Sequence, residues 1–313
     1  MHRAPVKETT INSGQASWQE AFLARHDLES SYLLHAQKWF DSLAGSLSAH
    51  CNGAFAPLLV AVNGCQGSGK TTLCAYLCAL LEAQYGLRAL SLSLDDFYLT
   101  RAQREALGAG VHPLLGTRGV PGTHDMALLC NTLDALLAPD CDTPVPVPRF
   151  DKARDDRRPR KEWDEVAGGV DLILLEGWCL GARPQSAGEL VQPINELERD
   201  EDSDGRWRNY VNAALRRDFL PLYERVDEWV MLQAPSFACV HNWRLEQEQK
   251  LRRQNAGTGE GLMTEAQLAR FIQYYQRLTG HCLKRLPARV NYLYTLDEQR
   301  QITAFKHRAA LAS

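Results

Sequence analysis

The chain has 313 residues, which is enough for one large domain or two domains of ordinary size. Its 35 Lys and Arg residues against 38 Asp and Glu give a net charge of −3, without the basic excess expected of a protein that binds nucleic acid or an anionic membrane. No apolar run reaches the length of a membrane span, the N-terminus lacks the apolar core of a secretory signal, and the nine cysteines form no C-x-x-C pair. We therefore expect a cytoplasmic protein without a disulfide framework or a zinc site.

Apolar periodicity predicts strands that alternate with helices along most of the chain. Short continuous apolar runs are typical of buried parallel strands, and apolar residues spaced by three and four are typical of helices that cover a sheet. In chain order, the predicted elements are two helices within 16–52, a strand at 57–62, a helix at 69–85, a strand ending at Asp95, a Gly- and Pro-rich loop at 108–122, a helix at 124–137, an irregular charged segment at 145–163, a strand ending at Glu176, a surface loop at 185–206, a helix at 207–224, a strand at 226–235, helices at 238–254 and 264–279, and a strand at 289–297.

The segment GCQGSGKTT, at 64–72, fits the pattern G-x-x-x-x-G-K-[ST] between a predicted strand and a predicted helix. Glycines allow successive backbone N–H groups to curve around phosphate oxygens, and the helix N-terminus adds its dipole. In this pattern the lysine reaches the β- and γ-phosphates and the hydroxyl after it binds magnesium. A Gly-rich turn without a ligand is the alternative. The expected nucleotide-binding residues are Gly64, Cys65, Gln66, Gly67, Ser68, Gly69, Lys70, Thr71 and Thr72.

Acidic residues end two of the predicted strands. Asp95 and Asp96 end one strand, and Glu176 ends another. Ligands of open α/β sheets bind at the carboxyl ends of the strands, and a buried carboxylate is costly unless it binds a metal, a proton donor or a cation. Phosphoryl transfer needs a magnesium ligand and a group that positions or deprotonates the attacking hydroxyl, so two such carboxylates can fill both roles. Helix capping or pairing with arginines is the alternative.

Five segments occur in the order GCQGSGKT, SLDDFYLT, RGVPGTHD, PRFDKARDDRRP and LLEGWCLGARP, and WRLEQEQKL follows. Over about 57–296 the chain resembles the plant-type D-glycerate 3-kinases and their bacterial relatives, within the group of uridine kinase, phosphoribulokinase and pantothenate kinase. The resemblance implies ATP-dependent phosphorylation of a small hydroxylated substrate, with Asp95 as base and Glu176 assisting magnesium. It gives Asp96 no clear counterpart. After FDKA, RDDRRP stands where the plant enzymes have a glycine-rich G-x-G-D-R segment.

Charged residues in two irregular segments are candidate ligands of the acceptor. A carboxylate-bearing acceptor such as glycerate needs a fixed cation, and an arginine offers a bidentate fork. The alternatives are that Thr123 is the N-cap of the next helix, with Asp125 favouring the helix start, and that the charge run is a solvated face. The candidate acceptor ligands are Arg118, His124, Asp151 and Arg157.

The basic segment 238–254 is expected to form a lid. A cation that closes on the γ-phosphate stabilises the spread charge, and a lid excludes water. The candidate lid residues are Arg244 and Arg252. The alternative is an exposed helix in which Glu246 pairs with Lys250.

Together these patterns predict a P-loop NTPase-type, three-layer α/β/α fold with a mainly parallel sheet and an N-terminal helical extension. We expect a loose N-terminus at 1–15, the helical extension at 16–52, and a kinase domain at 53–313 with the lid near 238–280. The expected cofactors are ATP and Mg²⁺, with Lys70, Asp95 and Glu176 catalytic and Thr71 and Glu176 as metal ligands.

The expected reaction is transfer of the γ-phosphoryl group to a small hydroxyl acceptor, most simply D-glycerate giving 3-phosphoglycerate. A nucleoside, pantothenate or a sugar is an alternative acceptor. A protein of another class, an ATP-binding regulator or assembly factor, is the second alternative. The absence of an N-K-x-D motif argues against a GTPase. No nucleic-acid or membrane partner is expected, and the sequence does not indicate the oligomeric state.

Overall fold

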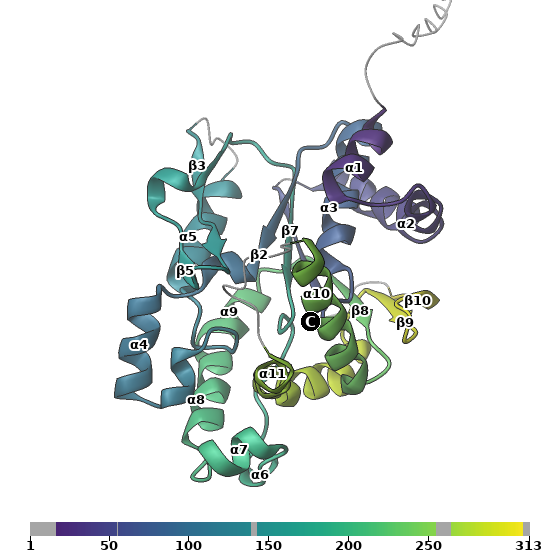
Figure 1. The fold of residues 1–313 in the computed structure, drawn as a ribbon. Coiled ribbons are helices and arrows are strands. Elements are labelled where there is room, and N and C mark those ends of the chain that lie inside the picture. The colour runs from purple at the N-terminus through teal and green to yellow at the C-terminus, as the bar shows by residue number, and fades with distance from the viewer. Residues whose placement is uncertain (1–16, 55, 139–142, 255–263, 309–313) are drawn as a thin grey trace, which may run out of the picture.

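A six-stranded sheet lies between two layers of helices in the computed structural model (Figure 1). The structure describes residues 17–54, 56–138, 143–254 and 264–308, except for the side chains of 247–254 and 265. The strand order is β10-β9-β8-β1-β7-β2, and every neighbouring pair is parallel except β9 with β10. The strands are β1 (Leu58–Gly64), β2 (Ala89–Ser93), β7 (Leu172–Gly177), β8 (Glu228–Gln233), β9 (Tyr292–Leu296) and β10 (Ile302–His307). The predicted three-layer fold with a mainly parallel sheet is therefore confirmed.

The central strands β1 and β7 are buried on both faces along their whole length, which explains their continuous apolar sequences. In β7, Leu172 and Leu174 contribute to the core on one face of the sheet, and Ile173 and Leu175 contribute to the core on the other. The first core is closed by α1 (Trp18–His26), α2 (Ser31–Gly53), α3 (Lys70–Tyr85) and the start of α10 (Phe237–Gln254). The second core is closed by α5 (Met126–Leu136), α8 (Arg206–Ala214), a π-helical turn (Leu215–Phe219), α9 (Leu220–Tyr223) and α11 (Glu265–Arg285).

The two predicted N-terminal helices are α1 and α2, and they pack on α3. The ring of Tyr76 on α3 lies against Trp18, Phe22 and Phe40, and its hydroxyl donates a 2.7 Å hydrogen bond to Asp41. This aromatic cluster binds the helical extension to the layer that carries the phosphate loop. The predicted loose N-terminus lies outside the described residues, and the domain boundary at residue 53 stays a prediction.

Several elements are missing from the sequence prediction. Helix α4 (Arg101–Gly110) begins with a capping box between Thr100 and Gln103. The segment predicted as irregular contains two small antiparallel pairs, β3 (Val145–Val147) with β6 (Asp164–Val166) and β4 (Phe150–Asp151) with β5 (Asp156–Arg157). Short 3-10 turns lie at Leu94–Phe97, Pro113–Gly116, Arg160–Glu162 and Leu286–Ala288.

The prediction of a surface loop at 185–206 is wrong. The segment forms α6 (Ala187–Val191) and α7 (Glu196–Glu201), and it buries Glu198 completely. The carboxylate of Glu198 accepts hydrogen bonds of 2.7 and 2.5 Å from Arg277 on α11. The same guanidinium donates to the carbonyl oxygens of Glu189 and Gln192. At least one acid of this segment is therefore buried in an ion pair with an arginine distant in sequence.

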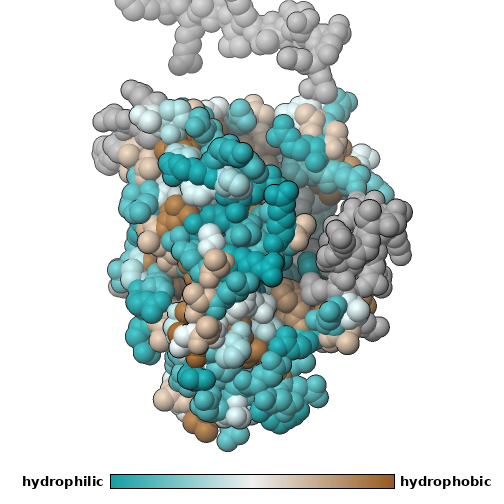
Figure 2. Space-filling model, turned by 60° about the vertical axis from the view of Figure 1, so that its left-hand side comes forward, coloured by the Kyte–Doolittle hydropathy of each residue, from teal (hydrophilic) through white to brown (hydrophobic). Residues whose placement is uncertain are grey.

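Hydrophilic residues dominate the face shown in Figure 2, and hydrophobic residues are scattered among them. Scattered apolar residues are normal on the surface of a globular domain. Among the described residues, no helix combines the length and the apolar character needed to cross a bilayer.

The Arg277→Met variant is expected to lose about 3–5 kcal/mol of unfolding free energy, because it leaves the buried Glu198 carboxylate without its cation. The matched control is Arg270→Met on the same helix, where Arg270 pairs with Glu201 and the two side chains are 49% and 41% exposed. The control is expected to lose at most about 1 kcal/mol. Urea unfolding followed by circular dichroism measures both, and equal losses would contradict the assignment.

Candidate active site

The phosphate loop connects β1 to α3 and has the backbone conformation that its glycines permit. Gly67 and Gly69 have φ angles of 79° and 90°, in the left-handed region that other residues rarely adopt. A Cβ atom on Gly67 would lie 2.8 Å from Cβ of Trp243, so Gly67 also allows close approach of α10. Ser68 Oγ and Gln66 Oε1 are buried and have no hydrogen-bond partner among the described residues. The loop therefore holds polar groups that a ligand can satisfy.

Cys65 lies in this loop with 5% of its surface exposed. Burial raises the pKa of its thiol to about 12, although the neighbouring Lys70 ammonium opposes the rise. A thiol with this pKa stays protonated at neutral pH and is a poor nucleophile. We assign Cys65 a packing role within the loop.

Strand register brings the acidic strand ends beside the loop. Glu176 on β7 pairs with Val62 of β1 on one side and with Ser93 of β2 on the other. Its carboxylate is 3.6 Å from Lys70 Nζ, and its Oε1 accepts a 3.0 Å hydrogen bond from Thr71 Oγ1. Glu176 Oε2 is buried and accepts no hydrogen bond from the described residues.

The ammonium of Lys70 stays charged in this site. Burial alone would lower the pKa of Lys70, but the carboxylates of Glu176 and Asp95 outweigh burial and raise it. The loop lysine and the two predicted catalytic acids therefore form one electrostatic group. Its arrangement suits the binding of a polyanion by Lys70 and of a hard cation by carboxylate and hydroxyl oxygens.

Asp95 lies two residues beyond β2 in a 3-10 turn. Its Oδ1 accepts a 3.0 Å hydrogen bond from the Tyr98 hydroxyl, and its Oδ2 accepts a 2.8 Å bond from Lys152 Nζ. Burial alone would raise the pKa of Asp95, but Lys152 and Lys70 together with these hydrogen bonds hold it well below its usual range. The carboxylate is therefore ionised at neutral pH and can accept a hydrogen bond from an acceptor hydroxyl.

The side chain of Asp96 makes different contacts from that of Asp95. It accepts hydrogen bonds of 3.0 Å from the Phe150 backbone N–H and 2.8 Å from Arg149. These contacts bind the β4–β5 hairpin, which carries Lys152, to the end of β2. Asp96 therefore positions the hairpin, a role that the sequence left unassigned.

His124 lies beside Tyr98, whose hydroxyl contacts Asp95. We call the region around Tyr98 and Phe150, which carries the candidate acceptor ligands His124, Arg118 and Arg157, the acceptor side. The rings of His124 and Tyr98 are stacked with their centroids 4.5 Å apart, and both nitrogens of His124 are buried without a hydrogen-bond partner among the described residues. Burial lowers the pKa of His124 to about 4, with Asp95 opposing the shift. The ring is thus neutral at pH 7 and can both donate and accept a hydrogen bond.

Comparisons with known proteins show which enzymes this chain resembles. A D-glycerate 3-kinase structure from Cryptococcus neoformans aligns at 30% identity with a TM-score of 0.69, covering 85% of this chain and 98% of that one. The chloroplastic D-glycerate 3-kinase of Arabidopsis thaliana is 31% identical over 248 residues, covering 77% of this chain and 48% of that protein. An uncharacterized kinase of Schizosaccharomyces pombe is 30% identical over 256 residues, covering 78% and 83%. No protein-family model matches the chain.

The chain belongs to the D-glycerate 3-kinase family. It is therefore an ATP-dependent phosphotransferase with an alcohol as acceptor, as the resemblance in its motifs implied. The roles of individual residues stay predictions that rest on the geometry above.

The other candidate acceptor ligands of this kinase make internal contacts. Arg118 pairs with Asp155 and lies over the Phe150 ring. Arg157 donates to the Tyr98 carbonyl oxygen and, at 3.0 Å, to Asp125. These contacts hold Arg118 beside Phe150 and Arg157 beside Tyr98.

Asp151 turns toward its own hairpin. Its Oδ1 accepts from the backbone N–H groups of Ala153 and Arg154, which lower its pKa, so no acceptor role follows from the contacts of Asp151. The alternative that Thr123 is the N-cap of the next helix is wrong. Asp125 caps α5 through Leu128 N, whereas Thr123 Oγ1 bonds within the preceding turn.

The predicted lid helix is α10, and its first half packs on the phosphate loop. Trp243 is 1% exposed, contacts the loop at Gly67, and donates a 2.7 Å hydrogen bond to the Glu298 carbonyl oxygen. Arg244 follows in the helix and is half-buried. The backbones of Lys250 and Arg252 are helical, but their side chains lie outside the described part of the chain. The predicted pairing of Glu246 with Lys250 therefore stays a prediction. Glu246 pairs with Arg300.

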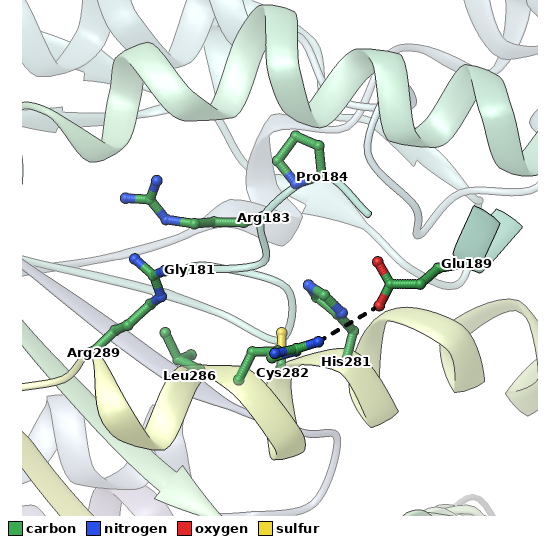
Figure 3. Close-up of a pocket in the computed structure, with 9 residues that line it drawn as sticks. Gly181, Arg183, Pro184, Glu189, His281, Cys282, Leu286 and Arg289 are labelled. Atoms are coloured by element: carbon green, nitrogen blue, oxygen red, sulfur yellow. Dashed lines mark ion pairs between the residues drawn. The ribbon is translucent and has the colours of Figure 1, made fainter. Parts of the chain in front are cut away.

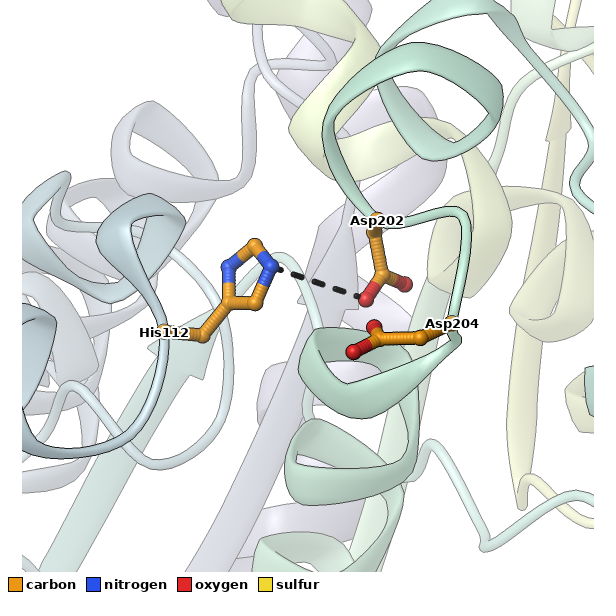
Figure 4. A group of neighbouring side chains, drawn as sticks. All are labelled: His112, Asp202 and Asp204. Atoms are coloured by element: carbon orange, nitrogen blue, oxygen red, sulfur yellow. Dashed lines mark ion pairs between the residues drawn. The ribbon is translucent and has the colours of Figure 1, made fainter.

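A second group of titratable side chains lies away from this site. His112, Asp202 and Asp204 present ligand atoms within 4.8 Å of one another (Figure 4). Asp202 already accepts hydrogen bonds from the Trp207 backbone N–H and from the Arg208 guanidinium. The side chains of Asp202 and Arg208 are 0% and 4% exposed. These contacts make the group a cap of α8 that joins it to the turn at His112.

Sequence reasoning gave Tyr98, Lys152 and Trp243 no individual role at the site. Tyr98 follows Asp95 by three residues, and the 3-10 turn between them returns its hydroxyl to the carboxylate. Lys152 was part of a charge run, and only the position of the hairpin reveals its contact with Asp95. Trp243 was noted only as the first residue of the family segment WRLEQEQKL.

The Lys152→Met variant is expected to move the acid limb of the pH profile to higher pH. Lys152 is the largest charge that lowers the pKa of Asp95, so its removal allows burial to raise that pKa. The ionised carboxylate is the competent form, so activity falls as pH drops through its pKa. Measuring kcat/KM for the acceptor between about pH 4 and about pH 9 tests this, with the exposed Lys161→Met as control. An acid limb that stays in place would contradict the assignment.

Proposed function

We propose that this kinase transfers the γ-phosphoryl group of ATP to a hydroxyl of D-glycerate, giving 3-phosphoglycerate. The supporting observation is the group of Lys70, Glu176 and Asp95, held together at the carboxyl ends of three adjacent strands beside the phosphate loop. The acceptor assignment rests in addition on the relatives named as D-glycerate 3-kinases.

In the proposed mechanism, the phosphate loop and the N-terminus of α3 hold the polyphosphate of ATP. Lys70 binds the β- and γ-phosphate oxygens. The negative charge of these oxygens then neutralises part of the Lys70 charge that Glu176 neutralises in the structure. Glu176 Oε2, which accepts no hydrogen bond from the part of the chain that the structure describes, and the Thr71 hydroxyl suit a magnesium ion. When bound there, Mg²⁺ neutralises charge on the phosphates.

Asp95 accepts a hydrogen bond from the attacking hydroxyl and orients its lone pair toward the γ-phosphorus. Its low pKa favours orientation, with the proton transferred as the bond to phosphorus forms. Lys152 contacts the same carboxylate and is 63% exposed, so an incoming acceptor can displace it. The released ammonium is then close to the acceptor's own carboxylate.

His124 is placed to bind an acceptor hydroxyl. Its neutral ring stacks on Tyr98, which itself donates to Asp95, so a hydroxyl held by His124 lies on the same side as the base. Arg118 supplies a cation at the wall of this region. A small acid with adjacent hydroxyl groups matches this set of donors and acceptors.

ADP release from ATP·Mg with a panel of acceptors tests the substrate. Strong stimulation by D-glycerate, and none by L-glycerate, uridine or pantothenate, is the expected result. Stimulation by another acceptor alone would retain the kinase and discard glycerate. No stimulation by any acceptor, together with a nucleotide-dependent change of shape, would favour a regulator.

Lys70→Ala and Asp95→Asn are each expected to lower kcat by about 10²–10⁴-fold, because each removes charge that acts in the transition state. Asp134→Asn is the control, since Asp134 is 64% exposed and pairs with Arg225 on the surface. Steady-state ADP release with saturating acceptor measures the effect. Full activity in Asp95→Asn would remove this residue from the mechanism.

Glu176→Gln is expected to raise the Mg²⁺ concentration needed for half-maximal activity by about tenfold or more, since it removes an anionic oxygen ligand. A Mg²⁺ titration at fixed ATP measures this, with the exposed Glu162→Gln as control. An unchanged requirement would place the metal elsewhere.

A further inference from the structure

A basic pocket lies between residues 181–189 and the C-terminal end of α11 (Figure 3). Its volume is about 240 Å³. Since a water molecule takes about 30 Å³ of the liquid, this is room for about eight waters and so for a small ligand. None of the residues that line it belongs to the phosphate loop or to the candidate acceptor ligands.

The charges around this pocket are unbalanced. Arg183, Arg285 and Arg289 line it with His281, against the single carboxylate of Glu189. Arg285 lies 3.9 Å from Glu189, whereas neither Arg183 nor Arg289 has a carboxylate within ion-pair distance among the described residues. Both of these side chains extend to the same end of the pocket in Figure 3.

Two guanidinium groups that converge without counter-charges create a positive potential in a concave site. Arginine is also the side chain best matched to planar, bidentate binding of phosphate or carboxylate oxygens. The pocket thus has the size and the donors for one small oxyanion.

The wall and floor of the pocket both contact the residue that precedes the phosphate loop. Asn63 Nδ2 donates hydrogen bonds of 3.1 and 2.7 Å to the carbonyl oxygens of Trp178 and Leu180, directly before Gly181 of the pocket wall. The Asn63 amide also acts on the thiol of Cys282, which lines the pocket: burial raises the pKa of that thiol, and Asn63 opposes the rise. Asn63 is 2% exposed and is followed by Gly64, the first glycine of the loop.

A ligand that draws Arg183 and Arg289 together moves the segment that Asn63 holds. The displacement then reaches the phosphate loop through one buried side chain. Coupling of this kind requires a ligand with different affinities for two arrangements of the loop. The ligand must then change the affinity for nucleotide by the same factor by which nucleotide changes the affinity for the ligand.

We propose that this pocket is an effector site for a small oxyanion carrying a phosphate group, and that its occupancy changes the affinity of the phosphate loop for nucleotide. Free phosphate and a phosphate monoester share the chemistry that the two arginines recognise. The site is separate from the one that carries the proposed reaction.

Calorimetric titration of the full chain tests the site. The protein is first saturated with a non-hydrolysable ATP analogue and Mg²⁺, which occupies the phosphate loop, and inorganic phosphate is then added. Phosphate is expected to bind, and Arg183→Gln and Arg289→Gln are each expected to weaken its binding about tenfold or more. The matched control is Arg199→Gln, an exposed arginine of α7 that pairs with Asp200.

Two further variants and a second probe sharpen the result. Arg118→Gln, on the acceptor side, is expected to leave phosphate binding unchanged. Glycerol 3-phosphate in place of phosphate distinguishes the two sources: tighter binding of the ester indicates a metabolite site, and equal binding indicates a phosphate site. No phosphate binding with the loop filled, or binding that depends on Arg118 and not on Arg183 and Arg289, would overturn the proposal.

The coupling has its own readout. The affinity of the ATP analogue, measured with and without phosphate, is expected to change by the same factor as the affinity of phosphate with and without the analogue. Asn63→Ala is expected to retain phosphate binding and lose this factor. Affinities that are independent of each other in the unaltered protein would overturn the effector role. Because none of these measurements needs turnover, they are independent of the identity of the acceptor.

Discussion

Glu176 carries a buried charge between two parallel neighbours, and the arrangement of the active site follows from how that charge is compensated. Its pairing with β1 and β2 leaves the carboxylate no exit to solvent. The compensating groups, Lys70 and Thr71, come from the first turn of α3. The helix must therefore begin where the loop ends, and the loop must be tight enough to bring it there. Strand register, loop conformation and the position of the lysine are in this sense one constraint.

The second acid of the site depends on a less regular part of the chain. Asp95 lies between the first turn of α3, which supplies Lys70, and the β4–β5 hairpin, which supplies Lys152. Asp96 and Arg149 fix that hairpin to the end of β2. Consecutive carboxylates thus have separate tasks: Asp95 is the base of the proposed mechanism, and Asp96 holds the hairpin whose Lys152 pairs with Asp95.

The grouping of Lys70 with Glu176 and Asp95 could be predicted because its signals are local. The spacing of glycines and lysine, and acids at the ends of apolar strands, require only the rule that parallel strands end at one edge. The acceptor side depends on contacts between residues far apart in sequence, such as Lys152 with Asp95, which no local pattern encodes. The same reason explains the error at 185–206. Glu198 can be buried there because it forms an ion pair with Arg277, which is 79 residues away in sequence. Strand β10 was missed because it is an edge strand with mostly exposed side chains, so it lacks an apolar run.

The contact of Trp243 with Gly67 has a consequence for how nucleotide enters. An indole buries about 150–250 Å² of surface, and at about 25 cal/mol per Å² its exposure costs about 4–6 kcal/mol. A rigid departure of α10 from the loop would therefore occur in only about one molecule in 10³–10⁴. The phosphate loop is thus assembled against its helix before ATP arrives, and the ordering cost of the loop is met during folding instead of being subtracted from the affinity for nucleotide.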